Sequence, residues 1–198
     1  MNQRRAHVHL AVASLLTMLL LTMAAVPANG ADLRRRQGSE DLAYRLTNCL
    51  RTGGYVTRAG KCMGRGSGHF SKYVKPLKRS SKISNKVAWP WARKSVRFYG
   101  TRTCWIGHAR NASTVDSRFA SVALRHTVNG ENMGCGFYGK PRATIVRVVR
   151  MWQYEKRYNG WHWRQLKSRD FRSVGVGVAS LGKRKTQLVV DFYGKRVR

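Results

Sequence analysis

The sequence predicts an α+β domain in which helices pack on a mostly antiparallel sheet. The stretch 141–160 places apolar residues at helical spacing, begins at a proline and ends at Asn159-Gly160. Two apolar stretches, 172–180 and 186–194, flank a Lys-rich turn, as is typical of a β-hairpin. Helical segments precede these strands and do not alternate with them, which favours the α+β class.

The chain begins with a segment typical of a signal peptide. Arg4 and Arg5 form a basic start, and an apolar run from Leu10 to Val26 leads to small residues. We therefore expect residues 1–31 to be cleaved at secretion. The mature protein is predicted to be secreted and extracellular, with no transmembrane span after cleavage.

The remaining chain is long enough for one domain with a sizeable core. Residues 32–39 are expected to form a loose basic tail, so the domain is placed at 40–198. A helix is predicted over 40–50, where acidic residues in the first turn precede apolar residues at helical spacing. The Gly- and Lys-rich stretch 51–73 is expected to be a loop that only a disulfide holds. A second helix is predicted over 80–96, kinked or starting late because it contains a proline.

Two segments lie between these helices and the long helix. A short helix is predicted over residues 116–126, with Asp116 or Ser117 as its N-terminal cap. Residues 126–136, HTVNGENMGCG, are expected to form an irregular turn that leads into a short extended piece.

The charge of the chain is strongly positive. There are 39 Lys and Arg residues against eight Asp and Glu residues, a formal net charge of +31 that falls to +29 without Arg4 and Arg5. Such a charge attracts anionic surfaces or polymers and opposes self-association, so we expect a monomer. The basic residues are spread along the chain and no nucleic-acid-binding motif is visible, which argues against specific nucleic acid recognition.

Four cysteines lie in the exported part of the chain: Cys49, Cys62, Cys104 and Cys135. An even number of cysteines in an oxidising compartment predicts two disulfides, for which three pairings are possible. We favour Cys49–Cys62, which closes a Gly-rich loop, together with Cys104–Cys135, which ties the central region. A zinc site at the cysteines is disfavoured because no C-x-x-C spacing is present.

Two histidines and two carboxylates are the candidate site residues: His108, Glu131, Glu155 and His162. Glu155 ends the apolar stripe of the long helix, where a solvated glutamate is not expected. A salt bridge to an arginine is the simpler explanation for it. Side chains of these types bind divalent metals with a position open to water, or form a His–Glu acid–base pair. His126, shortly before Glu131, is an alternative histidine.

Four motifs follow one another at compact spacing: GENMGCG, VVRMWQYEKRYN, GWHWRQLKSRDFRSVGVGVA and TQLVVDFYG. In this order they resemble the CAP superfamily of SCP-like domains, which includes cysteine-rich secretory proteins, venom antigen 5 and plant pathogenesis-related proteins. The resemblance covers about residues 40–194. It implies a three-layer α–β–α sandwich with a cleft that holds His108, Glu131, Glu155 and His162.

The resemblance also implies what such a cleft binds. In some members of the family it binds a divalent metal, often zinc, and others are linked to lipid or sterol binding at a separate surface. We therefore expect an extracellular binding or interaction module with a His/Glu cleft and a cationic surface.

Two alternatives remain beside this expectation. One is a metal-dependent or Glu/His hydrolase with Glu131 and His162 as its catalytic residues, although no Ser or Cys nucleophile stands out. The other is an electrostatic binder of cell-wall polyanions, anionic lipid or nucleic acid.

Overall fold

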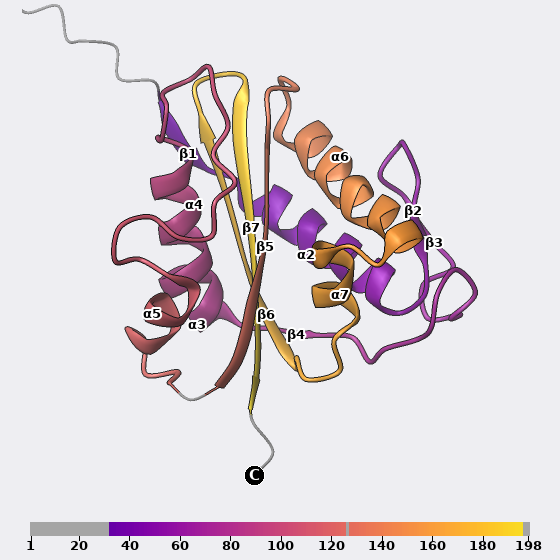
Figure 1. The fold of residues 1–198 in the computed structure, drawn as a ribbon. Helices are drawn as coiled ribbons and strands as arrows, with labels where there is room; N and C mark the ends of the chain where they lie inside the picture. Colours follow the sequence, from indigo (N-terminus) through magenta and orange to yellow (C-terminus); the bar gives the residue numbers. More distant parts are fainter. Residues whose placement is uncertain (1–31, 126, 196–198) are drawn as a thin grey trace, which may run out of the picture. The chain divides into compact units, whose positions relative to one another are not determined.

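The computed structural model describes residues 32–125 and 127–195, so the predicted signal peptide and His126 lie outside the described residues. Helices cover both faces of one sheet, as Figure 1 shows. The strands of this sheet are β1 (Leu33–Arg35), β4 (Lys78–Arg79), β5 (Thr127–Gly136), β6 (Ser173–Leu181) and β7 (Lys185–Lys195). The helices are α2 (Gln37–Arg51), α3 (Ser81–Ile83), the π-helical η1 (Ser84–Ala88), α4 (Trp89–Ser95), α5 (Val115–Ala120), α6 (Pro141–Tyr154), the 3-10 helix η2 (Glu155–Tyr158) and α7 (Trp161–Lys167). The predicted α+β class is confirmed.

The sheet is antiparallel except at one short strand. The strand order is β1-β6-β7-β5, and β4 pairs in parallel with the start of β6. The β6–β7 hairpin, which pairs Leu181 with Lys185 next to its turn, confirms the predicted hairpin. Strand β5 lies at the end of this order, with β7 as its neighbour.

Strand β5 occupies the predicted irregular turn as well as the short extended piece, so the turn was wrong and the extended piece is longer than predicted. It pairs with β7 without interruption from Thr127 to Gly136. Its glycines allow helices to approach: a Cβ on Gly134 would lie 2.2 Å from a methyl group of Val148 on α6. The glycines that resemble turn residues in the sequence therefore serve close helix–sheet packing.

One face of the sheet is covered by α2, α6 and α7. The core on this side includes Leu46 and Leu50 of α2 and Ile145, Val149 and Trp152 of α6. These side chains are at most 2% exposed. The long predicted helix is confirmed as α6 and η2, starting at its proline as expected.

The opposite face is covered by α3, η1, α4 and α5. The kink predicted around Pro90 is a π-helical turn, in which Trp89 donates its N–H to the carbonyl of Ser84. Such a turn accommodates proline, which has no N–H and crowds the carbonyl four residues earlier. Trp91 then packs in a core with Met133 of β5.

Helix α5 is shorter than predicted, and its cap lies earlier. Thr114 accepts from the N–H of Ser117, whose hydroxyl accepts from the N–H of Thr114. This reciprocal capping box replaces the predicted caps, Asp116 or Ser117.

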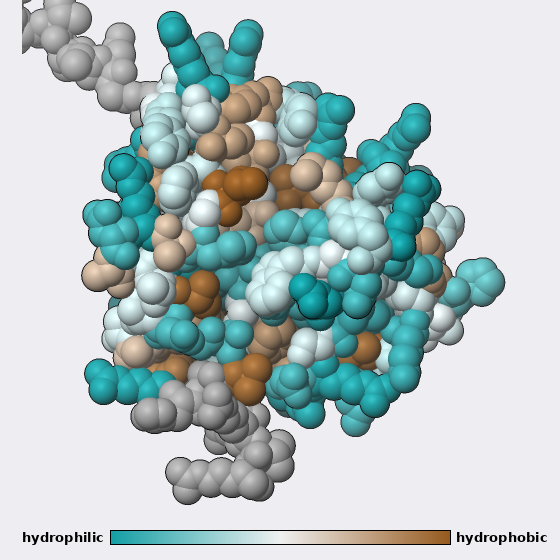
Figure 2. All heavy atoms as spheres, viewed as in Figure 1, coloured by the Kyte–Doolittle hydropathy of each residue, from teal (hydrophilic) through white to brown (hydrophobic). Residues whose placement is uncertain are grey.

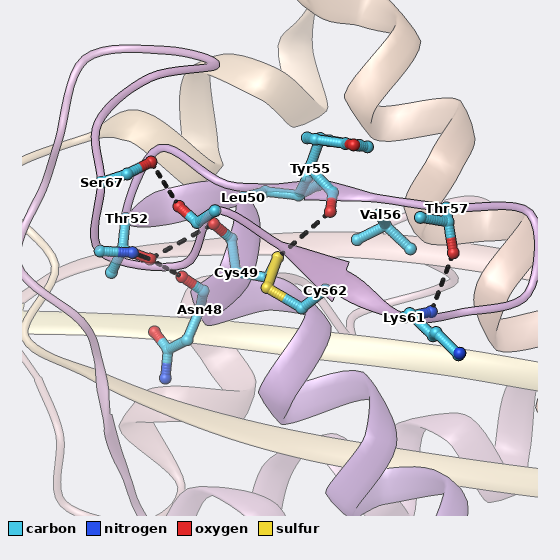
Figure 3. Close-up of a disulfide and its surroundings, with 12 residues drawn as sticks. Asn48, Cys49, Leu50, Thr52, Tyr55, Val56, Thr57, Lys61, Cys62 and Ser67 are labelled. Carbon is cyan, nitrogen blue, oxygen red and sulfur yellow. Dashed lines mark hydrogen bonds between the residues drawn. A yellow bond between two sulfur atoms is a disulfide. The ribbon is translucent and has the colours of Figure 1, made fainter.

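Both predicted disulfides, Cys49–Cys62 and Cys104–Cys135, are present. The first joins α2 to a separate two-stranded sheet of β2 (Tyr55–Val56) and β3 (Cys62–Met63), as Figure 3 shows.

The loop after α2 is not held by the disulfide alone, contrary to the prediction. Buried Arg51 donates hydrogen bonds to the carbonyls of Lys75, Leu166, Ser168 and Phe171. It thereby ties the end of the loop to the end of α7 and to the chain that follows it. Burial lowers the pKa of Arg51 to about 10.

Residues 32–39 are not a loose tail. Residues 33–35 form β1 against β6, and α2 already begins at Gln37. Glu40, which is 1% exposed, accepts from Arg35 at 2.9 Å. The burial of this carboxylate explains why the first residues of the segment are ordered against the sheet.

The face of the molecule shown in Figure 2 is dominated by hydrophilic side chains. On the face shown in Figure 2, hydrophobic residues occupy small separate areas. None of the helices in the described ranges has the length and apolar character needed to cross a membrane.

Candidate functional site

The first candidate pair joins His108 to Glu131 on strand β5. The Nδ1 atom of His108 lies 2.8 Å from Oε1 of Glu131, whose side chain is fully buried, while the His108 side chain is 37% exposed. The Cys104–Cys135 disulfide ties the segment that carries His108 to the same strand. This covalent link positions the histidine beside the carboxylate.

Arg118 of α5 contacts both members of the His108–Glu131 pair. Its Nη2 donates to Oε2 of Glu131 at 2.5 Å, and its Nη1 donates to the carbonyl of His108 at 3.1 Å. The guanidinium lies 4.1 Å from the centre of the Trp91 ring. Arg118 therefore neutralises the buried carboxylate and fixes the backbone of the histidine.

A second carboxylate, Asp191, is buried on the same face. It lies opposite Glu131 in the β5–β7 pairing and is 0% exposed. Neither of its oxygens accepts a hydrogen bond within the described ranges, but as a neutral acid Asp191 can donate one to Glu131, which adds to the rise of its pKa. Burial, and then the charge of Glu131, raise the pKa of Asp191 well above its usual range, while Arg118 opposes the shift. Asp191 is thus held toward its neutral form.

The second candidate pair joins Glu155 to His162. The Nδ1 of His162 lies 2.6 Å from Oε1 of Glu155, and the N–H groups of His162 and Trp163 donate to Oε2 at 2.9 and 3.3 Å. The imidazole stacks on the ring of Trp152. The sequence predicted an arginine as the partner of Glu155. The structure instead pairs Glu155 with a histidine and two backbone amides.

A left-handed turn brings this second pair together. Asn159 follows η2 with φ 51°, and Gly160 precedes α7. The turn reverses the chain, so that the start of α7 faces Glu155 at the end of α6. In α7, Trp161 is 55% exposed and Trp163 is 6% exposed, so these tryptophans lie on different faces.

The two pairs lie on opposite sides of β5. Glu131 contacts Arg118 of α5, whereas the next residue, Asn132, donates to the carbonyl of His162 at 3.1 Å. Neighbouring residues of a strand point to opposite faces. The four predicted site residues therefore form two His–Glu pairs separated by the edge strand.

A divalent metal does not fit these residues as they are arranged. No group of three or more His, Cys, Asp or Glu side chains that could hold a metal occurs in the described part of the chain. Both oxygens of Glu131 and both oxygens of Glu155 already accept hydrogen bonds. A metal at Glu131 would also meet the positive charge of Arg118. Zinc usually requires three or four ligands that converge on one point.

The pairs can orient a histidine for proton transfer. In each, the carboxylate contacts Nδ1, the arrangement by which a carboxylate fixes an imidazole tautomer. All four cysteines are in disulfides, so none is available as a nucleophile.

Arg118 and Asp191 were missed by the sequence-based prediction. Asp191 has a signal that could have found it, since it is the only charged residue in the apolar strand TQLVVDFYG. Arg118 has no such signal because it is one of 39 basic residues.

The structure resembles known solved structures at low sequence identity. An outer surface protein from Borrelia burgdorferi matches with a TM-score of 0.59 and 15% identity over 84% of this chain and 99% of that chain. The CAP domain of enterococcal PrgA matches with a TM-score of 0.42 and 15% identity over 80% of this chain and 62% of that chain. No family model matches the chain, and no curated protein does. At 15% identity the likeness to the outer surface protein shows a shared fold alone. The TM-score of 0.42 for the CAP domain is too low to assign this chain to the CAP superfamily, so that resemblance stays a prediction.

Proposed function

We propose that this protein is an extracellular binding module that holds anionic polymers or surfaces through its cationic surface. The observation that carries the proposal is that few of its positive charges have an acidic partner within the described ranges. The eight acidic residues form ion pairs with only four arginines in the described ranges: Arg34, Arg35, Arg79 and Arg118. Most of the basic side chains in the described ranges therefore have no carboxylate partner there, which leaves their charge available to anions in the surroundings.

The other acidic side chains do not alter this balance. Asp116 and Asp170 accept hydrogen bonds from Asn129 and Ser168, which carry no charge. Glu155 is paired with His162, and Asp191 is buried. Fixed positive charge of this size raises the local concentration of polyanions and accelerates their association.

Calorimetric titration of the mature protein with inorganic polyphosphate tests the proposal. We expect saturable binding at about 50 mM salt and a loss of at least about a hundredfold in affinity at about 500 mM, because bound counterions are released. Uncharged dextran of similar length is the matched control and should not bind. Absence of polyphosphate binding at low salt, or equal affinity at both salt concentrations, would contradict the proposal.

A further inference from the structure

Three neighbouring surface hollows run along the outer side of α6 and η2. Their volumes are about 690, 420 and 320 Å³. Arg150 lines all three, and Arg147 and Tyr154 each line two, so the hollows adjoin one another. We call this surface the α6 groove and define it by six residues: Tyr138, Arg147, Arg150, Tyr154, Arg157 and Tyr158.

The positive charge of the α6 groove has no acidic partner. Neither Arg147, Arg150 nor Arg157 forms an ion pair within the described ranges. The Nε of Arg150 is buried and likewise has no hydrogen-bond partner among the described residues. A buried donor of this kind is stabilised when an acceptor reaches it. Glu155 also borders the groove, but His162 and backbone amides occupy its oxygens.

Exposed aromatic rings alternate with these arginines. Tyr138, Tyr154 and Tyr158 are 45%, 56% and 64% exposed. Arg147 lies 4.2 Å from the ring centre of Tyr138, and Arg157 lies 4.6 Å from that of Tyr154. One of the hollows is lined by Arg147, Arg150, Tyr154 and Tyr158 together, so the same surface presents both cations and rings.

We propose that the α6 groove binds single-stranded nucleic acid without sequence preference, with phosphates at its arginines and bases stacked on its tyrosines. Basic grooves with interleaved aromatic rings are what such binding requires. An acidic polysaccharide would also use the arginines, and its sugar rings can pack C–H groups on tyrosines, whereas nucleic acid bases offer flat π-faces that stack on all three exposed tyrosines. The fourteen residues of α6 span about 21 Å, long enough to contact several nucleotides of one strand.

This proposal rests on the proposed function, because it names the polyanion and its location. It does not conflict with the spread of basic residues along the sequence. Folding brings arginines of α6 and η2, together with Tyr138 from the preceding loop, around adjoining hollows. Sequence-specific reading of bases is not part of the proposal, since stacking tolerates any base.

Fluorescence anisotropy with a labelled oligothymidine of about 15 nucleotides tests the α6 groove, with polyphosphate measured in parallel. The double variant Tyr154→Leu, Tyr158→Leu should weaken oligothymidine binding at least about tenfold and change polyphosphate binding less than about twofold. Arg150→Gln should weaken both probes. The matched controls are Tyr73→Leu, an exposed tyrosine outside the groove, and Arg93→Gln, an exposed arginine on α4; each should leave oligothymidine binding within about twofold.

The outcomes separate this proposal from the proposed function. Unchanged oligothymidine binding in the tyrosine variant, or equal weakening of both probes, would overturn the nucleic acid assignment while polyanion binding stands. Failure of wild-type protein to bind either probe would overturn both. If the leucine variant does not fold, Tyr154→Trp, Tyr158→Trp serves instead: oligothymidine binding retained or strengthened supports stacking, and binding lost contradicts it.

Discussion

At the scale of single residues, Glu131 is held by a compensating charge. Arg118, with a side chain only 10% exposed, donates to it within the fold. Glu131→Gln would leave that guanidinium unpaired, and we expect a loss of about 3 kcal/mol in the free energy of unfolding. Asp41→Asn, which breaks an exposed pair with Arg79, is the matched control and should cost less than about 1 kcal/mol. Urea unfolding measures both, and equal costs would contradict the argument.

The buried Asp191 predicts a pH dependence of stability. Its folded pKa lies above its unfolded value near 3.8, because burial disfavours the charged form. The stability contributed by the neutral acid is complete below the unfolded pKa and is lost as pH rises through the folded pKa, by at most about 1.4 kcal/mol per pH unit.

Replacement of this acid should therefore stabilise the protein in one pH range only. We expect Asp191→Asn to be more stable than wild type at pH about 8, with a difference that shrinks toward pH about 4. Exposed Asp170→Asn should show no such trend. Urea unfolding across this range is the measurement, and a constant difference between wild type and Asp191→Asn would show that the Asp191 charge is not involved.

The predicted zinc site can be tested directly at these residues. Because the oxygens of Glu131 and Glu155 are occupied, we expect calorimetry to detect no saturable one-to-one zinc binding at neutral pH. Binding that disappears in the double variant Glu131→Gln, His162→Ala would contradict the expectation. It would mean that zinc draws the two pairs together.

At the scale of elements, the Glu155–His162 pair depends on the turn between η2 and α7, which contains Asn159. Its φ of 51° lies in the left-handed region, which asparagine and glycine tolerate and β-branched residues do not. Asn159→Val should lower the free energy of unfolding by about 1–2 kcal/mol, whereas Asn159→Gly should change it by less than about 0.5 kcal/mol. Thermal unfolding compares the two variants, and equal effects would show that the backbone conformation carries no cost.

Elements with a clear period were predictable, and those shaped by tertiary contact were not. Helix α6 and the β6–β7 hairpin follow from their apolar patterns. Strand β5 was missed because its glycines suit turns, and only the approach of α6 near Gly134 explains them. The candidate site follows the same rule. Its histidines and glutamates could be chosen from the sequence. Their separation into one pair on each side of β5 could not, because it depends on the opposite directions in which Glu131 and Asn132 point from the strand.

At the scale of the whole molecule, the uncompensated positive charge governs association. Like charges repel over about 20 Å at ionic strengths near 20 mM, so the mature protein should scatter light as a single chain at low salt. Polyphosphate added near charge equivalence removes the repulsion and should produce turbidity that about 500 mM salt reverses. A dimer at low salt without polyanion would contradict this prediction. It would require an interface strong enough to overcome a formal net charge of +31, or +29 after cleavage, on each chain.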